Sequence, residues 1–313
     1  MSLARSAQIA WAVGLALLIA APFLGIYPVF LMKALTFAIF ACAFNLLLGY
    51  TGLLSFGHAA FMGSAAYATG WFVQSAGLSP ELAVLGGVLV AAAIGLLVGL
   101  LAIRSEGIYF AMITLALAQM VYFVCLQAPF TGGEDGLQGV ARGNLFGMLP
   151  LRDDMTMYFL VLAVFVAVFL GIVRIVRSPF GQVLKAIREN EPRAISLGYD
   201  VNRYKLLAFV LSTAIAGLAG SLKTLVLGFA TLTDVHWSLS GEVVLMTLLG
   251  GMGTFAGPVI GAFTVIGLQN FLSDLVGSWV SVIIGAIFIV CVLAFRRGIV
   301  DELLAWMQRR KIS

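Results

Sequence analysis

Residues 250–258 read GGMGTFAGP and interrupt an apolar run that extends from 243 to 271. A single helix over this run would be about 43 Å long, whereas the hydrocarbon core of a membrane is about 30 Å thick. Each glycine inside a helix costs up to about 1 kcal/mol, and a proline costs about 3 kcal/mol. The run is therefore predicted to be a broken helix that either enters and returns or crosses twice as two short pieces. The alternative is a chance group of glycines in one ordinary helix.

The composition of the chain is unusually apolar and poor in charge. Of the 313 residues, 62% are hydrophobic and only 10% are charged, and the mean hydropathy is +1.08. A soluble domain has about a quarter of its residues charged, so a water-soluble globular protein is excluded. Lipid is expected to surround a bundle of helices. The net charge of +4 is explained by basic residues that orient the protein in the membrane, so this charge does not indicate a nucleic-acid partner.

Apolar runs that suit membrane crossing follow one another along the whole chain. They predict an all-α integral membrane protein with about eight to ten transmembrane helices in a single transmembrane domain, 1–313. The first run is interpreted as a span and not as a signal peptide, because no A-x-A cleavage site closes it. The predicted runs are 9–26, 29–50, 59–73, 82–103, 108–128, 155–173, 206–222, 243–271 and 275–295.

The two longest polar segments carry opposite charge. Residues 174–205 contain seven basic and three acidic residues, whereas residues 129–154 contain four acidic and two basic ones. The positive-inside rule therefore predicts a cytoplasmic loop at 174–205 and a periplasmic loop at 129–154. Basic residues near both termini place these in the cytoplasm as well. A single crossing by 243–271 would put the basic C-terminus outside, which favours the broken helix.

A second glycine-rich interruption, GYTGLLSFGH, occupies residues 49–58 in the other half of the chain. Paired interruptions in the two halves of a membrane protein indicate a transport site, since unwound backbone in lipid must line a cavity or be covered by protein. Helices that restart after Gly57 and Gly257 would offer free N–H groups to a carboxylate or carbonyl. The predicted substrate pathway comprises Asn45, Gly49, Thr51, Gly52, Ser55, Gly57, His58, Gly250, Gly253, Thr254, Gly257 and Pro258.

The polar members of this set have a structural alternative. Helix–helix hydrogen bonding or small-residue packing accounts for Thr51 and Ser55 equally well. His58 needs a partner in its apolar neighbourhood, and a structural hydrogen bond is the favoured interpretation. An intramembrane hydrolase with Ser55 or Ser64 beside His58 is a distant alternative, because no G-x-S-x-G elbow surrounds Ser64.

The chain lacks the sequence features of an energy source. None of its lysines follows a glycine, as a phosphate-binding loop requires, and no H-E-x-x-H motif occurs. Lysines and carboxylates are expected near the ends of the spans, which disfavours an ion-coupled carrier acting alone. Cys42, Cys125 and Cys291 lie in apolar runs and are expected to be buried thiols. No metal or cofactor is expected in this chain, so uphill transport would need energy from another subunit.

The loop 174–205 contains a predicted docking element. Residues 182–190 have the pattern of an amphipathic helix, with Val183, Leu184 and Ile187 on one side. A proline interrupts the pattern, and 192–197 is predicted to form a second short helix ended by Gly198. Two short helices with charges of both signs suit docking to a partner subunit. The alternative is a solvated loop whose basic residues only fix the topology.

Five blocks of sequence form one recognisable set. They are NLLLGYTGLLSFGHAAFMG (45–63), RSEGIYFAMITLAL (104–117), TGGEDGL (131–137), the whole of 178–222, and LGGMGTFAGPVIG (249–261). Together these blocks resemble one known family, the LivM-type permeases of branched-chain amino acid ABC transporters. The blocks follow one another in the family order, and the resemblance runs from about 45 to 295. Similar permeases serve urea, amides and aromatic acids, so the resemblance is less specific for the substrate.

The resemblance implies an ABC importer permease fold in the bacterial inner membrane. The implied partners are a second, LivH-like permease, two cytoplasmic ABC ATPases that use ATP and Mg²⁺, and a periplasmic substrate-binding protein. The implied activity is ATP-driven import of branched-chain or related amino acids, with no catalysis by this chain itself. The positions implied to couple to the ATPases are Phe180, Gly181, Arg188, Glu189, Asn190, Ala194 and Gly198.

Overall fold

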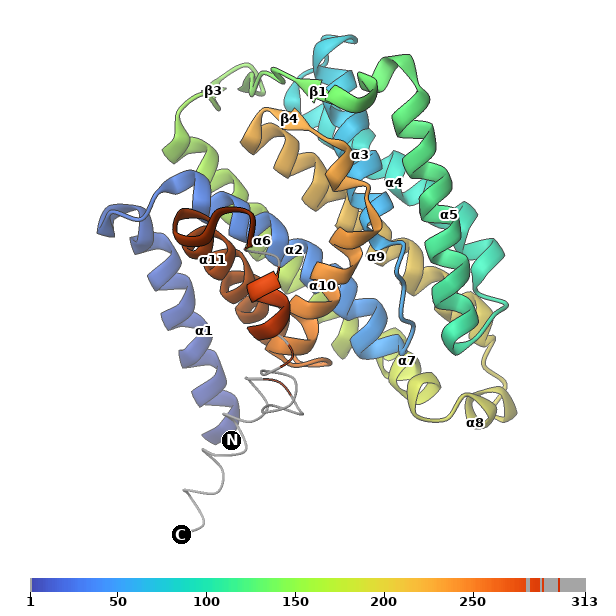
Figure 1. The fold of residues 1–313 in the computed structure, drawn as a ribbon. Helices are drawn as coiled ribbons and strands as arrows, with labels where there is room; N and C mark the ends of the chain where they lie inside the picture. The colour runs from blue at the N-terminus through green and yellow to red at the C-terminus, as the bar shows by residue number, and fades with distance from the viewer. Residues whose placement is uncertain (1, 280–281, 288, 290–297, 299–313) are drawn as a thin grey trace.

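Helices form most of the chain in the computed structural model, which describes residues 2–279, 282–287, 289 and 298 (Figure 1). The long helices are α1 (Ser2–Ala20), α2 (Pro28–Thr51), α3 (His58–Gln74), α4 (Pro80–Ala102), α5 (Gly107–Gln127), α6 (Asp154–Arg177), α9 (Val201–Leu227), α10 (Trp237–Gly250) and α11 (Gly257–Val276). Two short helices, α7 (Pro179–Glu189) and α8 (Glu191–Ser196), connect α6 to α9. The 3-10 helices are η1 (Ala21–Leu24), η2 (Pro129–Thr131), η3 (Gly133–Asp135), η4 (Leu232–Asp234) and η5 (Gly277–Trp279).

Five of the described helices are long and apolar enough to cross a membrane, namely α2, α4, α5, α6 and α9. Shorter apolar helices occupy Trp11–Leu24, Trp237–Gly250 and Gly257–Ser273. The all-α membrane fold expected from the sequence is therefore confirmed. Helix α2 lies at the centre of the bundle, where it packs against α6, α9 and α11. Part of the predicted run 275–295, namely 280–281, 288 and 290–295, lies outside the described residues.

The two oppositely charged loops lie at opposite ends of the bundle (Figure 1). One end, called here the α7–α8 end, carries the two short helices of the basic loop. The other, called the strand end, carries the acidic loop, whose short strands are β1 (Leu137–Gln138), β2 (Asn144–Leu145) and β3 (Leu149–Pro150). β2 pairs with β3, and β1 pairs antiparallel with β4 (Phe229–Ala230), which follows α9.

The helices α2–α3–α4 and α9–α10–α11 repeat one pattern. In each unit a long helix ends at a glycine with positive φ, which is 80° at Gly52 and 78° at Gly228. An irregular segment then leads to a shorter helix that starts at His58 or directly after His236. The third helix of each unit has a proline in its first turn. Correspondingly, α4 packs against α9 and α11 packs against α2.

The two units run in opposite directions. Helix α2 ends at the α7–α8 end, where the side chain of Arg188 on α7 donates a hydrogen bond to the carbonyl oxygen of Gly49. Helix α9 ends at the strand end, where the carbonyl oxygen of Gly228 accepts a hydrogen bond of 2.8 Å from the N–H of Val140. The fold is thus an inverted repeat, an arrangement in which interrupted helices border transport sites.

Candidate functional site

Both glycine-rich interruptions predicted from the sequence are present, but they are not equivalent in the inverted repeat, because residues 228–236 correspond to the first interruption and the second one lies between the last two helices of its unit. The first break, residues 52–57, separates α2 from α3. The second break, residues 251–256, separates α10 from α11, so the run 243–271 is two helices joined by a turn and not one long helix. Positive φ angles of 121° at Gly251 and 81° at Gly253 explain the need for glycine in this turn, because residues with a Cβ rarely adopt them.

The structure brings the second break against the end of α2, and Asn45 joins them. The Asn45 side-chain amide donates to the carbonyl oxygen of Thr254 at 2.9 Å and accepts from the N–H of Gly253 at 2.9 Å. The Thr254 hydroxyl in turn donates to the carbonyl oxygen of Gly251 at 2.8 Å and accepts from the N–H of Gly257 at 3.0 Å. The two polar side chains therefore provide hydrogen-bond partners for the N–H and C=O groups of the unwound backbone, which would be costly to bury unpaired.

Glycine also permits close backbone contact at this junction. A Cβ at Gly49 would lie 2.8 Å from the backbone nitrogen of Gly253. A Cβ at Gly250 would overlap the carbonyl oxygen of Gly257 at the start of α11. These two positions hold α2, α10 and α11 together at the α7–α8 end.

Arg188 on α7 contacts both breaks. Besides its hydrogen bond to the carbonyl oxygen of Gly49, its Cγ would lie 3.2 Å from a Cβ at Gly52, and its Nη1 would lie 3.3 Å from a Cβ at Gly253. The carbonyl groups at a helix C-terminus have no partner within the helix and carry partial negative charge, so a guanidinium stabilises them. One side chain of the short helix α7 therefore lies against both interruptions and donates a hydrogen bond to the end of α2.

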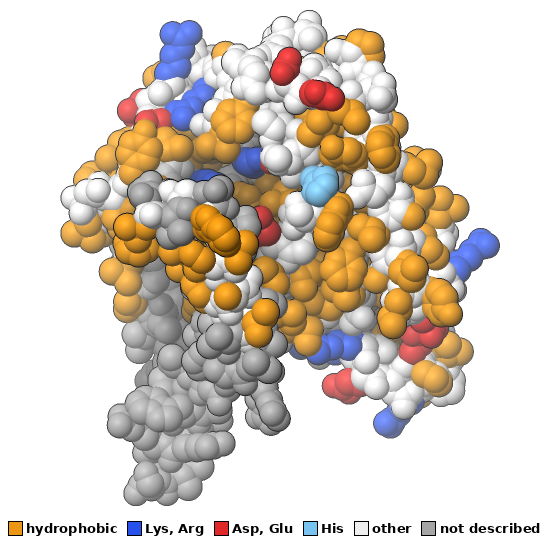
Figure 2. All heavy atoms as spheres, in the orientation of Figure 1, with side chains coloured by type: hydrophobic (Ala, Val, Ile, Leu, Met, Phe, Trp, Pro, Cys, Tyr) orange, Lys and Arg blue, Asp and Glu red, His pale blue; other side chains and the backbone are white. Residues whose placement is uncertain are grey.

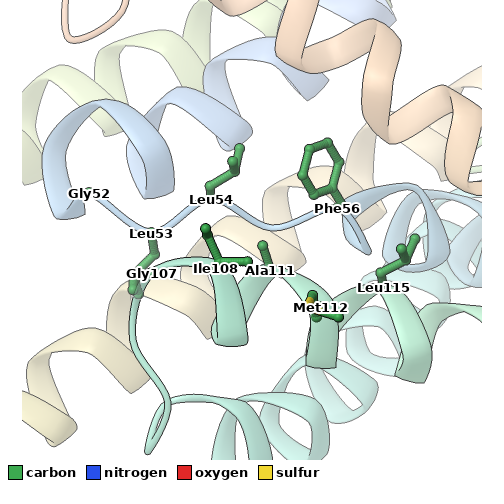
Figure 3. A pocket seen from close by; sticks show the side chains of 9 residues that line it. All are labelled: Gly52, Leu53, Leu54, Phe56, Gly107, Ile108, Ala111, Met112 and Leu115. Atoms are coloured by element: carbon green, nitrogen blue, oxygen red, sulfur yellow. The ribbon is translucent and has the colours of Figure 1, made fainter.

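A groove borders the first break on the side of α5. It has a volume of about 400 Å³ and an apolar lining, and Figure 3 shows the break running alongside α5, with Leu53 directed toward Gly107. The lining residues are Gly52, Leu53, Leu54 and Phe56 from the break, and Gly107, Ile108, Ala111, Met112 and Leu115 from α5.

A smaller cavity of about 200 Å³ adjoins the groove at the α7–α8 end and shares Gly52, Leu53 and Gly107 with it. Its other lining residues are Thr51, Glu106, Ile187, Arg188, Glu191 and Lys205. Lys205 and Glu191 form an ion pair of 2.6 Å there. The site thus combines an apolar groove with a charged mouth, a combination suited to a small solute with one aliphatic and one polar part.

His58 lies in the core and not on this groove. It is fully buried, and its Nε2 lies 3.0 Å from the Ser212 hydroxyl, which donates its only proton to the carbonyl oxygen of Ala43 at 2.5 Å. Nε2 therefore carries the hydrogen in this pair. The rings that surround the imidazole belong to Phe40, Phe44, Phe61 and Phe209.

The other serine and threonine candidates are also held by the fold. Thr51 donates to the carbonyl oxygen of Leu46 at 3.2 Å, although the residue borders the smaller cavity. Ser55 is buried with no hydrogen-bond partner among the described residues. Ser64 donates to the carbonyl oxygen of Phe61, so neither serine pairs with His58. Gly57 caps the start of α3, and Pro258 lies in the first turn of α11.

The two short helices predicted in the basic loop are present. The Ser178 side chain caps the start of α7, and the Asn190 side chain caps α8 by accepting from the N–H of Arg193 at 3.0 Å. Gly198 follows α8 with a φ of 88°, in the predicted capping role. Of the remaining positions implied to couple, Gly181 and Ala194 are buried, Phe180 stacks on Tyr204, and Glu189 is exposed.

Exposed apolar side chains at the end of α8 and directly after it were missed by the sequence reasoning. Ile195, Leu197 and Tyr199 are exposed by 58%, 68% and 40% at the tip of the α7–α8 end. Several large apolar side chains exposed close together in the sequence, outside the lipid-facing part of a membrane protein, are consistent with a protein contact. The signal available in the sequence was three apolar residues within a loop otherwise rich in charge.

A comparison with protein-family models matches residues 27–292 to the branched-chain amino acid transport system permease component. The chain belongs to this family. It is 28% identical over 261 residues to the high-affinity branched-chain amino acid transport system permease protein LivM of Escherichia coli K12. That alignment covers 76% of this chain and 61% of the relative, so the chain spans only about three fifths of the relative's length.

Further relatives are matched over smaller shares of the chain, and one of them is named for a sugar. A probable branched-chain amino acid permease LivM of Methanocaldococcus jannaschii is 28% identical, with 56% of this chain and 52% of the relative covered. The ribose import permease protein RbsC of Bacillus subtilis is 29% identical, with 58% of each chain covered. No solved structure matches the chain significantly.

Proposed function

We propose that this chain is a permease subunit of an ATP-driven importer in the bacterial inner membrane, with both termini in the cytoplasm. Its proposed partners are a second LivH-like permease, two ABC ATPases that supply ATP and Mg²⁺ chemistry, and a periplasmic binding protein. This chain binds no cofactor and catalyses no reaction itself. The observation that carries the proposal is the contact of Arg188 with both breaks, because it joins a loop that suits ATPase docking to the interrupted helices.

The proposed substrates are branched-chain or related amino acids. An apolar groove with a charged mouth fits a small solute that has an aliphatic side chain and a charged head group. The relative of greatest chain coverage reported above is named for branched-chain amino acids. The alternatives within the family are urea, amides and aromatic acids, and the ribose permease among the relatives adds sugars as a further one.

The proposed mechanism follows from the contacts of α7. Closure of the ATPases on ATP would displace α7 and α8, and Arg188 would transmit the movement to the first break and the second break together. The groove beside α5 would then open toward one end of the bundle and close toward the other. The exposed residues Ile195, Leu197 and Tyr199 are the proposed contacts with the ATPase.

Reconstitution in proteoliposomes tests the proposal. The chain with its partner permease, ATPases and binding protein should accumulate radiolabelled L-leucine only when ATP is present. Uptake by this chain alone, driven by a Na⁺ or H⁺ gradient, would instead identify an ion-coupled carrier. Uptake of ribose but not of leucine by the complete transporter would keep the importer role and overturn the substrate.

A further inference from the structure

Four charged side chains gather toward the strand end, within the bundle. They are Lys33 on α2, Lys223 on α9, Asp234 on η4 and Glu242 on α10, called here the charged cluster. The sequence suggested separate charges near the ends of spans, whereas the fold brings them within electrostatic range of one another. Figure 2 shows basic and acidic side chains inside a hollow of an otherwise largely hydrophobic face. Ionisable groups in such surroundings are expensive and mark functional sites.

Two members of the cluster neutralise each other. Lys223 and Asp234 are 7% and 3% exposed and form an ion pair. The other carboxylate oxygen of Asp234 accepts from the N–H of Thr231 at 3.2 Å. This pair is complete without a ligand and fixes the segment 228–236 against α9.

The other two members lack such a partnership. Lys33 forms no ion pair within 4.0 Å among the described residues, and Glu242 forms none either. The hydrogen-bond partner of the Glu242 carboxylate is the neutral amide of Gln269, at 3.2 Å. Both residues are half-buried. Opposite charges that are near each other, partly desolvated and yet unpaired leave room for a ligand that completes them.

We propose that Lys33 and Glu242 bind the head group of a zwitterionic α-amino acid, with its carboxylate at Lys33 and its ammonium at Glu242. This inference rests on the proposed importer function and names the recognition of its substrate. A sugar or urea carries neither charge and would leave both residues unpaired, so the site discriminates against them.

The inverted repeat supports this position independently. In the second unit, residues 228–236 correspond to the first break, and Asp234 of the cluster belongs to this segment. The apolar groove lies beside the first break at the α7–α8 end, and the charged cluster lies beside its counterpart toward the strand end. One pathway would therefore have a charged site near one end and an apolar groove near the other.

Binding of head-group analogues to the assembled transporter tests the proposal. The permeases and ATPases are placed in lipid nanodiscs without the binding protein, and saturation-transfer NMR titrations give the dissociation constants. The probes are L-leucine, 4-methylpentanoate, which lacks the ammonium, and 3-methylbutylamine, which lacks the carboxylate. The variants are Glu242→Gln and Lys33→Gln, with Glu134→Gln as a control, because Glu134 is an exposed acid at the strand end.

Each variant should lose recognition of one charge only. Glu242→Gln should weaken L-leucine about tenfold or more, as expected for a lost charge-assisted hydrogen bond, and leave 4-methylpentanoate unchanged. Lys33→Gln should weaken L-leucine similarly and leave 3-methylbutylamine unchanged. A merely structural role would weaken all three probes together, or none, and either result would overturn the proposal.

Two further measurements separate this inference from the proposed function. Copurification with the ATPases shows whether each variant assembles. Glu242→Gln is an isosteric replacement, and Lys33→Gln keeps a straight polar side chain without the charge. ATP-driven leucine uptake by the wild-type transporter with its binding protein tests the importer role. If the wild-type transporter imports leucine but the variants keep the wild-type preference among the three probes, the charged site is overturned and the importer role is kept. Absence of leucine binding to the wild-type complex would also overturn the charged site.

Discussion

Replacement of Arg188 by methionine should uncouple ATP hydrolysis from transport. The change keeps most of the aliphatic contact with the position of Gly52 but removes the hydrogen bond to the carbonyl oxygen of Gly49. A hydrogen bond from a charged donor contributes about 1.5–3 kcal/mol when buried. Arg188 is an exposed residue, so solvent screening reduces this contribution to about 1 kcal/mol.

The expected effect on coupling follows from that free energy. A change of about 1 kcal/mol shifts an equilibrium about fivefold, so the number of substrate molecules imported per ATP hydrolysed should fall about fivefold. ATP hydrolysis itself should continue, because Arg188 is directed toward the breaks and the exposed side chains of Ile195, Leu197 and Tyr199 remain available for docking.

The assay measures leucine uptake and phosphate release in the same proteoliposomes. Arg193→Met is the matched control, because Arg193 is an exposed arginine of the same loop that forms no ion pair among the described residues. Equal ratios of uptake to hydrolysis in the wild type and the Arg188 variant would refute the transmission role. Loss of the ATPases from the Arg188 variant on purification would instead assign it to docking.

Three further substitutions test the breaks and the groove. Gly250→Ala should destabilise the purified permease by about 1–3 kcal/mol, because the added Cβ would overlap the carbonyl oxygen of Gly257 at the start of α11. Gly241→Ala should be tolerated, because the space around its Cβ is open. Thermal unfolding in detergent measures the stability of both variants. Asn45→Leu should leave two backbone groups of the second break unpaired and lower the free energy of unfolding by about 2–6 kcal/mol. Retention of the wild-type melting temperature would contradict the role of Asn45 in holding the second break against α2. Met112→Trp should fill the apolar groove and abolish leucine uptake. Met120→Trp should not, because Met120 is similarly exposed on α5 but lies outside the groove. Leucine uptake by both variants would refute the groove as a pathway.

Local features of the structure could be predicted well from the sequence. The breaks were recognisable because glycine and proline disfavour helix wherever they occur, and α7 and α8 were recognisable by their periodicity and by the proline at 192. The ends of the bundle followed from the distribution of charge. Each of these inferences depends on residues that are neighbours in the sequence.

Features made by distant residues could not be predicted in this way. Nothing near residue 188 shows that its guanidinium reaches Gly49, which is 139 positions earlier. The partnership of α5 with the first break, and the charged cluster, likewise depend on packing of separate helices. One clue to the inverted repeat was available: a glycine lies five residues after each histidine, at Gly63 and Gly241.

Helix α11 connects the two sites that these contacts define. It begins at the second break, next to the position of Arg188, and its residue Gln269 donates to the carboxylate of Glu242 in the charged cluster. Gln269 lies twelve positions after Gly257, which corresponds to a helical rise of about 18 Å. A helix is stiff over this distance, and α11 is packed along the central helix α2. A displacement of α7 that moves the second break must therefore also move Gln269 against Glu242, so the loop at one end and the charged site toward the other change together.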